Sequence, residues 1–119
     1  MKRHNFKNLK IWQKGIELAI TSYEITRKFP KEEKYGLVSQ MNRCAVSVPS
    51  NIAEGTAKSS DKHFKIFLEN ALGSSFEWQT QLIIAHKIGY VSKDKFDEYE
   101  SNITEIQRMI NSFMDRIKS

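Results

Sequence analysis

The stretch FDEYESNITEIQRMINSFMDRI, residues 96–117, decides the fold class. Its large apolar residues recur at alternating steps of three and four: Phe96, Tyr99, Ile103, Ile106, Ile110, Phe113 and Ile117. A helix of 3.6 residues per turn places residues with this spacing on one face, and so regular a seam is typical of a helical bundle. The stretch therefore predicts a long amphipathic helix, with Ser92 as its N-terminal cap.

Three segments with the same spacing precede it, over residues 9–28, 31–57 and 61–89. The first ends at Phe29-Pro30, because the residue before a proline disfavours helical geometry. Ser59 or Ser60 is predicted to cap the third helix, and Gly89 to end it. The seam of the first helix is read as Leu9, Trp12, Ile16, Ala19 and Tyr23. Short connections between four helices predict an all-α, antiparallel, up-down-up-down bundle that fills one domain, residues 1–119.

The core of this bundle is predicted to include Trp78, Leu82, Ile103 and Ile106. A second apolar stripe runs along the first and third helices, about 200° around each helix from its seam. Large exposed apolar patches often mark interfaces, so this stripe predicts an oligomer contact. The residues assigned to that contact are Ile11, Leu18, Phe76 and Ile83. The alternative is a wide buried stripe in an irregular bundle.

A proline, Pro49, lies inside the second helical segment, where it removes a backbone hydrogen bond and is destabilising. Small and polar residues surround it, and the helix-kink or interface motif is read as Ser47, Pro49, Asn51, Glu54 and Gly55. On one interpretation Asn51 and Glu54 bond carbonyl groups that the proline frees. On the other, Arg43 and Asn51 contact a phosphate or a neighbouring chain. We expect the proline to bend the helix toward a neighbour.

The net charge of +5 is unevenly placed. Five basic residues come before the first acidic one, Glu17: Lys2, Arg3, Lys7, Lys10 and Lys14. From residue 15 onward, 14 basic residues balance 14 acidic ones. A basic cluster raises affinity for polyanions, so the N-terminal segment is a candidate nucleic-acid contact. The alternative is a charged terminus that only keeps the protein soluble.

The motifs of enzymes and metal sites are missing from the sequence. There is no Glu-x-x-His pair, no Cys-x-x-Cys pair, no glycine-rich phosphate loop and no nucleophile elbow. The one cysteine, Cys44, falls on an apolar seam and is read as an inert buried thiol. We expect no enzymatic activity, no metal and no cofactor. A lone cysteine, with no signal-like or membrane-spanning apolar run, predicts a cytoplasmic protein that does not contact membranes.

Several motifs together resemble a family of four-helix-bundle proteins encoded in intervening sequences of bacterial 23S ribosomal RNA genes. The resemblance starts at residues 6–14 (FKNLKIWQK) and continues through Phe29-Pro30, Glu33, Tyr35-Gly36-Leu37 and Ser39-Gln40. Its most specific part is Arg43 followed by residues 47–55 (SVPSNIAEG). Residues 68–74 (LENALGS) and Gly89-Tyr90 complete it. Cys44 and Val48 depart mildly from the family's pattern.

The resemblance implies an antiparallel four-helix protomer that assembles into a homopentameric ring. The chain is also similar to the accessory protein of diversity-generating retroelements, a basic pentamer that binds nucleic acid and a reverse transcriptase. No catalytic residues follow from the resemblance. Two functions stay open: an adaptor that binds RNA or DNA through its basic residues, Arg43 among them, and a protein-interaction scaffold without a nucleic-acid role.

Overall fold

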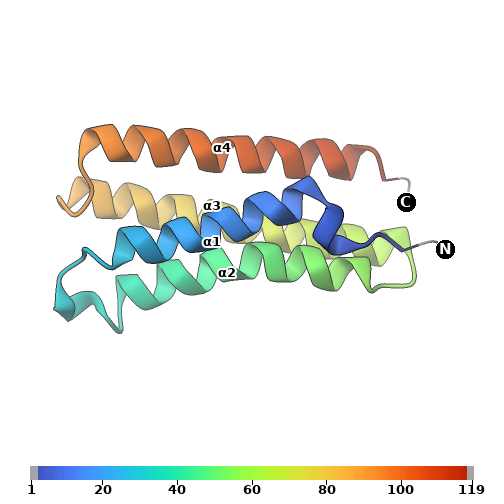
Figure 1. Cartoon of the computed structure of the whole chain (residues 1–119), viewed down its shortest axis with the longest axis horizontal. Helices are drawn as coiled ribbons and strands as arrows, with labels where there is room; N and C mark the ends of the chain where they lie inside the picture. The colour runs from blue at the N-terminus through green and yellow to red at the C-terminus, as the bar shows by residue number, and fades with distance from the viewer. Residues whose placement is uncertain (1–2, 118–119) are drawn as a thin grey trace.

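The computed structural model describes residues 3–117 of the chain and is all-α, which confirms the predicted fold class (Figure 1). Its four α-helices are α1 (Lys10–Thr26), α2 (Leu37–Thr56), α3 (Asp61–Lys87) and α4 (Lys93–Asp115). Two short 3-10 helices, η1 (Phe6–Asn8) and η2 (Lys31–Glu33), precede α1 and α2. The predicted second helix began too early, because residues 31–33 form a separate turn. Within residues 3–117, no helix is long and apolar enough to cross a membrane.

Each helix packs against its neighbours in the sequence, and the contact between α1 and α4 is the least extensive of the four helix pairs. Helices α1 and α3 make no close backbone contact, so they lie diagonally across the bundle. The start of α1, the connection between α2 and α3 and the last turn of α4 lie at one end of the molecule (Figure 1). We call this the terminal end. The α1–α2 and α3–α4 connections lie at the far end.

Helix caps lie where the sequence predicts them. The side chain of Ser60 accepts a hydrogen bond from the backbone of His63 at the start of α3, and Ser92 accepts one from Lys95 at the start of α4. Gly89 has a φ of +91°, the left-handed conformation that glycine adopts readily. The backbone N–H of Tyr90 donates to the carbonyl of Ala85, and this closes the C-terminus of α3 with a Schellman motif.

The predicted seams of α2, α3 and α4 form the core. Trp78, Leu82, Ile103 and Ile106 are all buried, as expected. They pack in one cluster with buried residues of α2, among them Met41, Val48 and Ile52. Burial of these faces is the main favourable contribution to folding.

The core face of α1 is rotated from the predicted one, so that the predicted seam residues Leu9, Trp12 and Ala19 pack only at its edge, and this corrects two assignments. Ile11 and Leu18, predicted as interface residues, are each only 4% exposed and lie in the core of the protomer. Tyr23, predicted as a seam residue, is 50% exposed. The sequence was ambiguous because both stripes are apolar, and the true core stripe also contains Gly15 and Ser22.

Contacts from other helices explain why Gly15 and Ser22 are buried. The Oγ of Ser22 accepts a hydrogen bond from Nε1 of Trp78 at 3.0 Å and donates one to Oδ1 of Asn42 at 2.9 Å. A Cβ atom on Gly15 would lie 3.1 Å from Cβ of Pro49, so the glycine leaves room for the proline ring. Trp78 on α3 and Asn42 on α2 thus bond the Ser22 hydroxyl, and the Pro49 ring on α2 fills the space beside Gly15. The spacing of residues within α1 does not reveal these contacts.

Candidate nucleic-acid interface

The N-terminal segment folds back onto the terminal end of the bundle. The side chain of Asn5 accepts a hydrogen bond from the backbone of Lys7 and caps η1. Nε of Arg3 donates to the carbonyl of Ala57 at 3.1 Å, and Nε2 of Gln13 donates to the carbonyl of Lys7 at 2.9 Å. These bonds hold the basic N-terminal residues in place. This turn was not predicted from the sequence, although Asn5 followed by a short aromatic segment is a weak capping signal.

An aromatic cluster anchors the same segment. The ring of His4 lies 5.7 Å from the rings of both Phe64 on α3 and Phe113 on α4. Phe64 and Phe113 also contact each other edge to face, the geometry that aromatic pairs prefer. The N-terminal segment is therefore tied to both of the helices that meet it at the terminal end.

Basic side chains from three separate parts of the chain gather at the terminal end, which we define as the basic end. The N-terminal segment and the first turns of α1 bring Arg3, Lys7, Lys10 and Lys14, and the start of α3 and the turn before it bring Lys58, Lys62 and Lys65. Arg116 directly follows α4, and Arg108 lies about two turns before the end of that helix. Within residues 3–117, two of these cations make ion pairs, Lys14 with Glu17 and Arg108 with Glu105, and both pairs are exposed. Lys2 lies outside the described residues.

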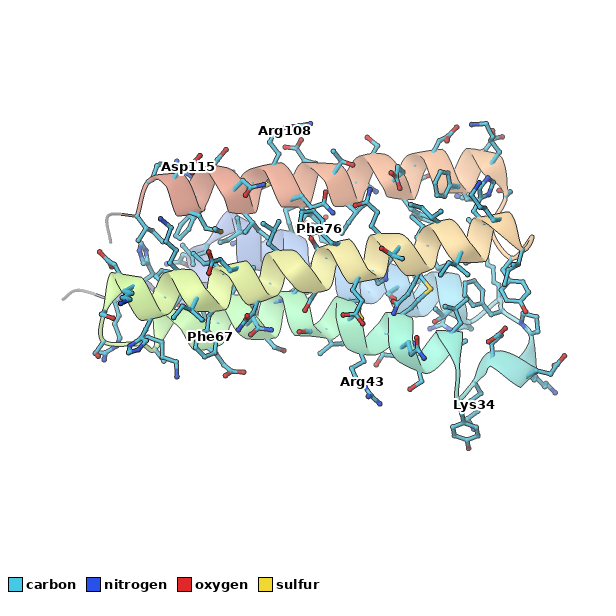
Figure 2. The ribbon with its side chains drawn as sticks, turned by 180° about the vertical axis from the view of Figure 1, so that it is seen from behind. Lys34, Arg43, Phe67, Phe76, Arg108 and Asp115 are labelled. Carbon is cyan, nitrogen blue, oxygen red and sulfur yellow. The ribbon has the colours of Figure 1, made fainter. Side chains whose placement is uncertain are left out.

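Arg43 does not join this group. It is exposed on α2, and Figure 2 shows its side chain pointing away from the bundle. It precedes the end of α2, Thr56, by 13 residues, which is about 20 Å along the helix axis. The structure thus separates Arg43 from the N-terminal cations with which the sequence grouped it.

The Pro49 motif joins α2 to its two neighbouring helices. Pro49 is buried against Gly15 of α1, within the same chain. Nδ2 of Asn51 donates to the carbonyl and the hydroxyl of Ser47, at 2.8 and 2.9 Å. Ser47 in turn shares a hydrogen bond of 2.9 Å with the hydroxyl of Ser74 on α3. Asn51 thus bonds a backbone carbonyl as one interpretation expected, although the carbonyl that a proline at 49 frees belongs to residue 45.

The two remaining motif residues differ in environment. Gly55 is buried, and a Cβ there would lie 2.7 Å from Cδ1 of Phe64, so the close approach of α2 and α3 requires glycine at this position. Glu54 is exposed on the outer face of α2. Most residues of the motif therefore pack α2 against α1 and α3.

Cys44 lies in the seam between α2 and α3 and is 8% exposed. Burial, reinforced by the neighbouring carboxylate of Glu77, raises the pKa of this thiol to about 11. The thiol is therefore protonated at neutral pH and is a poor nucleophile. Within residues 3–117, no three His, Cys, Asp or Glu side chains cluster as metal ligands would.

Exposed apolar residues form two stripes. The α1 stripe, with one contribution from α2, consists of Ile20, Tyr23 and Val46. The α3 stripe consists of Ile66, Phe76, Ile84 and Ile88. Phe76 is labelled on α3 in Figure 2 and is exposed. Ile83, the other α3 residue predicted for the oligomer contact, is half-buried. Because α1 and α3 are diagonal in the bundle, the two stripes are centred on helices that do not contact each other.

Comparisons with known proteins identify the family. The model of the family described as 23S rRNA-intervening sequence protein matches residues 7–112. No curated protein matches the chain. A solved structure from Bacteroides thetaiotaomicron VPI-5482, described as a protein of unknown function from the S23 ribosomal protein family, is similar in fold, with a TM-score of 0.81. It is 22% identical in sequence, and the match covers 88% of this chain and 95% of that one. The chain therefore belongs to the 23S rRNA-intervening sequence protein family.

Proposed function

We propose that this protein is a non-enzymatic adaptor that binds RNA or DNA through the basic end of its bundle. The observation that carries the proposal is the gathering of cations from three separate segments at one end, with an N-terminal segment held there by hydrogen bonds. Fixed cations on one surface attract a phosphate backbone, and the release of its counterions drives binding. Within residues 3–117 no base-reading motif is evident, so binding is expected to show little sequence preference.

The second part of the proposal is a ring. An antiparallel four-helix protomer with apolar stripes on two separate helices can join head to tail, and such contacts close into a ring when the rotation between protomers divides a full turn. The number five, a homopentamer, comes from the family resemblance. A fivefold ring repeats the basic end five times, so weak contacts at each protomer combine into useful affinity.

Neutralising three cations of the basic end should weaken binding. We expect the variant Lys7→Gln, Lys10→Gln, Lys14→Gln to bind a labelled structured RNA at least about tenfold more weakly at low salt, because each lost lysine removes a phosphate contact. The dependence of its affinity on salt should also become shallower. Fluorescence anisotropy measures both quantities. The matched control is Lys28→Gln, Lys31→Gln, Lys34→Gln, which removes three exposed charges at the far end.

The control is expected to stay within about twofold of the parent. Equal losses in the two triple variants would show that binding follows net charge alone and would contradict a localised basic end. A parent protein that binds no RNA at low salt would overturn the proposal.

The exposed stripes favour a second candidate, a scaffold that binds other proteins and has no nucleic-acid role. Apolar patches of this kind also suit partner chains. The resemblance suggests a reverse transcriptase as one such partner. A stable ring that binds no RNA at any salt concentration would favour the scaffold over the adaptor.

A further inference from the structure

The weak contact between α1 and α4 leaves a groove at the basic end. The groove encloses about 440 Å³ and runs between residues 8–11 and the last three turns of α4. This volume lies within the range of about 300–1,000 Å³ that is usual for ligand sites. Lys10 stands on one wall, and Arg108 and Arg116 stand on the other.

We infer that this groove holds a single-stranded stretch of the nucleic acid, with Arg108 and Arg116 as its phosphate ligands on α4. The inference rests on the proposed function and adds to it the place and the form of the bound strand. It assigns a role to two arginines that were not predicted as site residues from the sequence. Acidic residues balance the basic ones after residue 15, so a count of charges does not single these arginines out.

The spacing of the arginines suits a strand. Arg108, Ser112 and Arg116 follow one another at steps of four, so they share one face of α4. A rise of 1.5 Å per residue puts Arg108 and Arg116 about 12 Å apart along the helix axis. This length spans at least two phosphates, and about three in a stacked strand, which carries one per about 3.4 Å. A guanidinium group can hold a phosphate through two parallel hydrogen bonds.

The floor of the groove favours a single strand over a duplex. It includes Met109 and Phe113, which are half-buried; the Phe113 ring also contacts His4 and Phe64, and the guanidinium of Arg116 lies 5.9 Å from its centre. The planar guanidinium beside this aromatic cluster offers an unstacked base a flat surface, and single-strand-binding proteins use such cation-π contacts. The bases of a duplex are stacked inside and cannot reach such a floor.

One carboxylate lines the groove as well. Glu105 stands near the middle of α4 and pairs with Arg108. The pair is exposed, with 65% of the Arg108 side chain and 52% of the Glu105 side chain accessible, so water screens it strongly. A phosphate can therefore compete for Arg108.

The test uses the full chain, a labelled single-stranded RNA 12-mer and the blunt duplex of the same sequence. We expect Arg108→Gln with Arg116→Gln to weaken single-strand binding at least about fivefold at low salt. The slope of log affinity against log salt should become shallower by about 1.4 for the two lost phosphate contacts. Duplex binding should change less than about twofold.

The matched control is Lys93→Gln with Lys95→Gln, at the opposite end of the same helix. Those two lysines are exposed and pair with helical neighbours, Asp97 and Glu98, so the control removes the same number of charges and one ion pair more than the arginine variant, which loses the pair of Arg108 with Glu105. The control should leave single-strand affinity within about twofold, and thermal unfolding monitored by circular dichroism should be alike for both double variants.

The outcomes separate the two proposals. If the parent binds no RNA, the proposed function fails, and this inference fails with it. If the lysine variants of the N-terminal segment weaken binding but the arginine pair behaves as its control does, the groove alone is overturned. Equal losses on duplex and single strand overturn the single-strand assignment.

Discussion

Replacing Trp78 by Ala is expected to lower the free energy of unfolding by about 3–5 kcal/mol, because the change leaves a large cavity. Trp78 is 1% exposed and lies at the centre of the core cluster. Its Nε1 also donates to Ser22, which bonds Asn42 of α2 in turn. The substitution therefore removes packing and a buried donor at once. Urea denaturation followed by far-UV circular dichroism, at one fixed protein concentration, measures the loss.

The control for this prediction is Tyr35→Ala. Tyr35 is 87% exposed and has little packing to lose, so its replacement should change the free energy of unfolding by less than about 0.5 kcal/mol. A Trp78→Ala variant as stable as the Tyr35→Ala variant would show that the centre of the bundle is placed wrongly.

A single charge on either apolar stripe is expected to dissociate the proposed ring. We predict that Ile20→Glu, on the α1 stripe, and Phe76→Glu, on the α3 stripe, each lower the mass from five times the 13.9 kDa of one chain to that of a single chain. Burying an unpaired carboxylate in an interface is strongly unfavourable. Because a head-to-tail ring uses both stripes at every contact, either variant should suffice.

Light scattering after size-exclusion chromatography at micromolar concentration measures this mass. The control is Ser101→Glu, which adds the same charge at an exposed polar position of α4 and should leave the ring intact. A monomeric parent chain, or two stripe variants that keep the parent mass, would overturn the ring.

The sequence predicted those parts of the fold that depend on local chemistry. The caps at Ser60 and Ser92 and the left-handed Gly89 follow from side-chain and backbone preferences within a few residues, and they were placed correctly. Three of the four core seams were also read correctly, including that of α3, although α3 carries a second apolar stripe as α1 does.

The α1 seam could not be read in the same way. Its core face carries Gly15 and Ser22, and what makes them fit is a proline ring on α2 and an indole on α3. Such partners are far away in the sequence, so spacing within α1 gives no sign of them. The interface residues Ile11 and Leu18 were misassigned for this reason.

The candidate site was predicted only in part. The N-terminal run of lysines is visible in the sequence, but its meeting with Arg108 and Arg116 depends on how α1 and α4 pack. The role of Pro49 was also hidden. The proline was expected to bend α2 toward a neighbour, and the packing of its ring against Gly15 of the same chain was not foreseen.

The most direct test of the account is the salt dependence of RNA binding by the unmodified protein. Fluorescence anisotropy with a labelled RNA that contains single-stranded loops, from about 50 to 200 mM salt, gives the slope of log affinity against log salt. We predict tight binding at low salt and a steep negative slope, because several phosphates are neutralised at once. No binding at 50 mM salt, or an affinity that does not change with salt, would contradict the account.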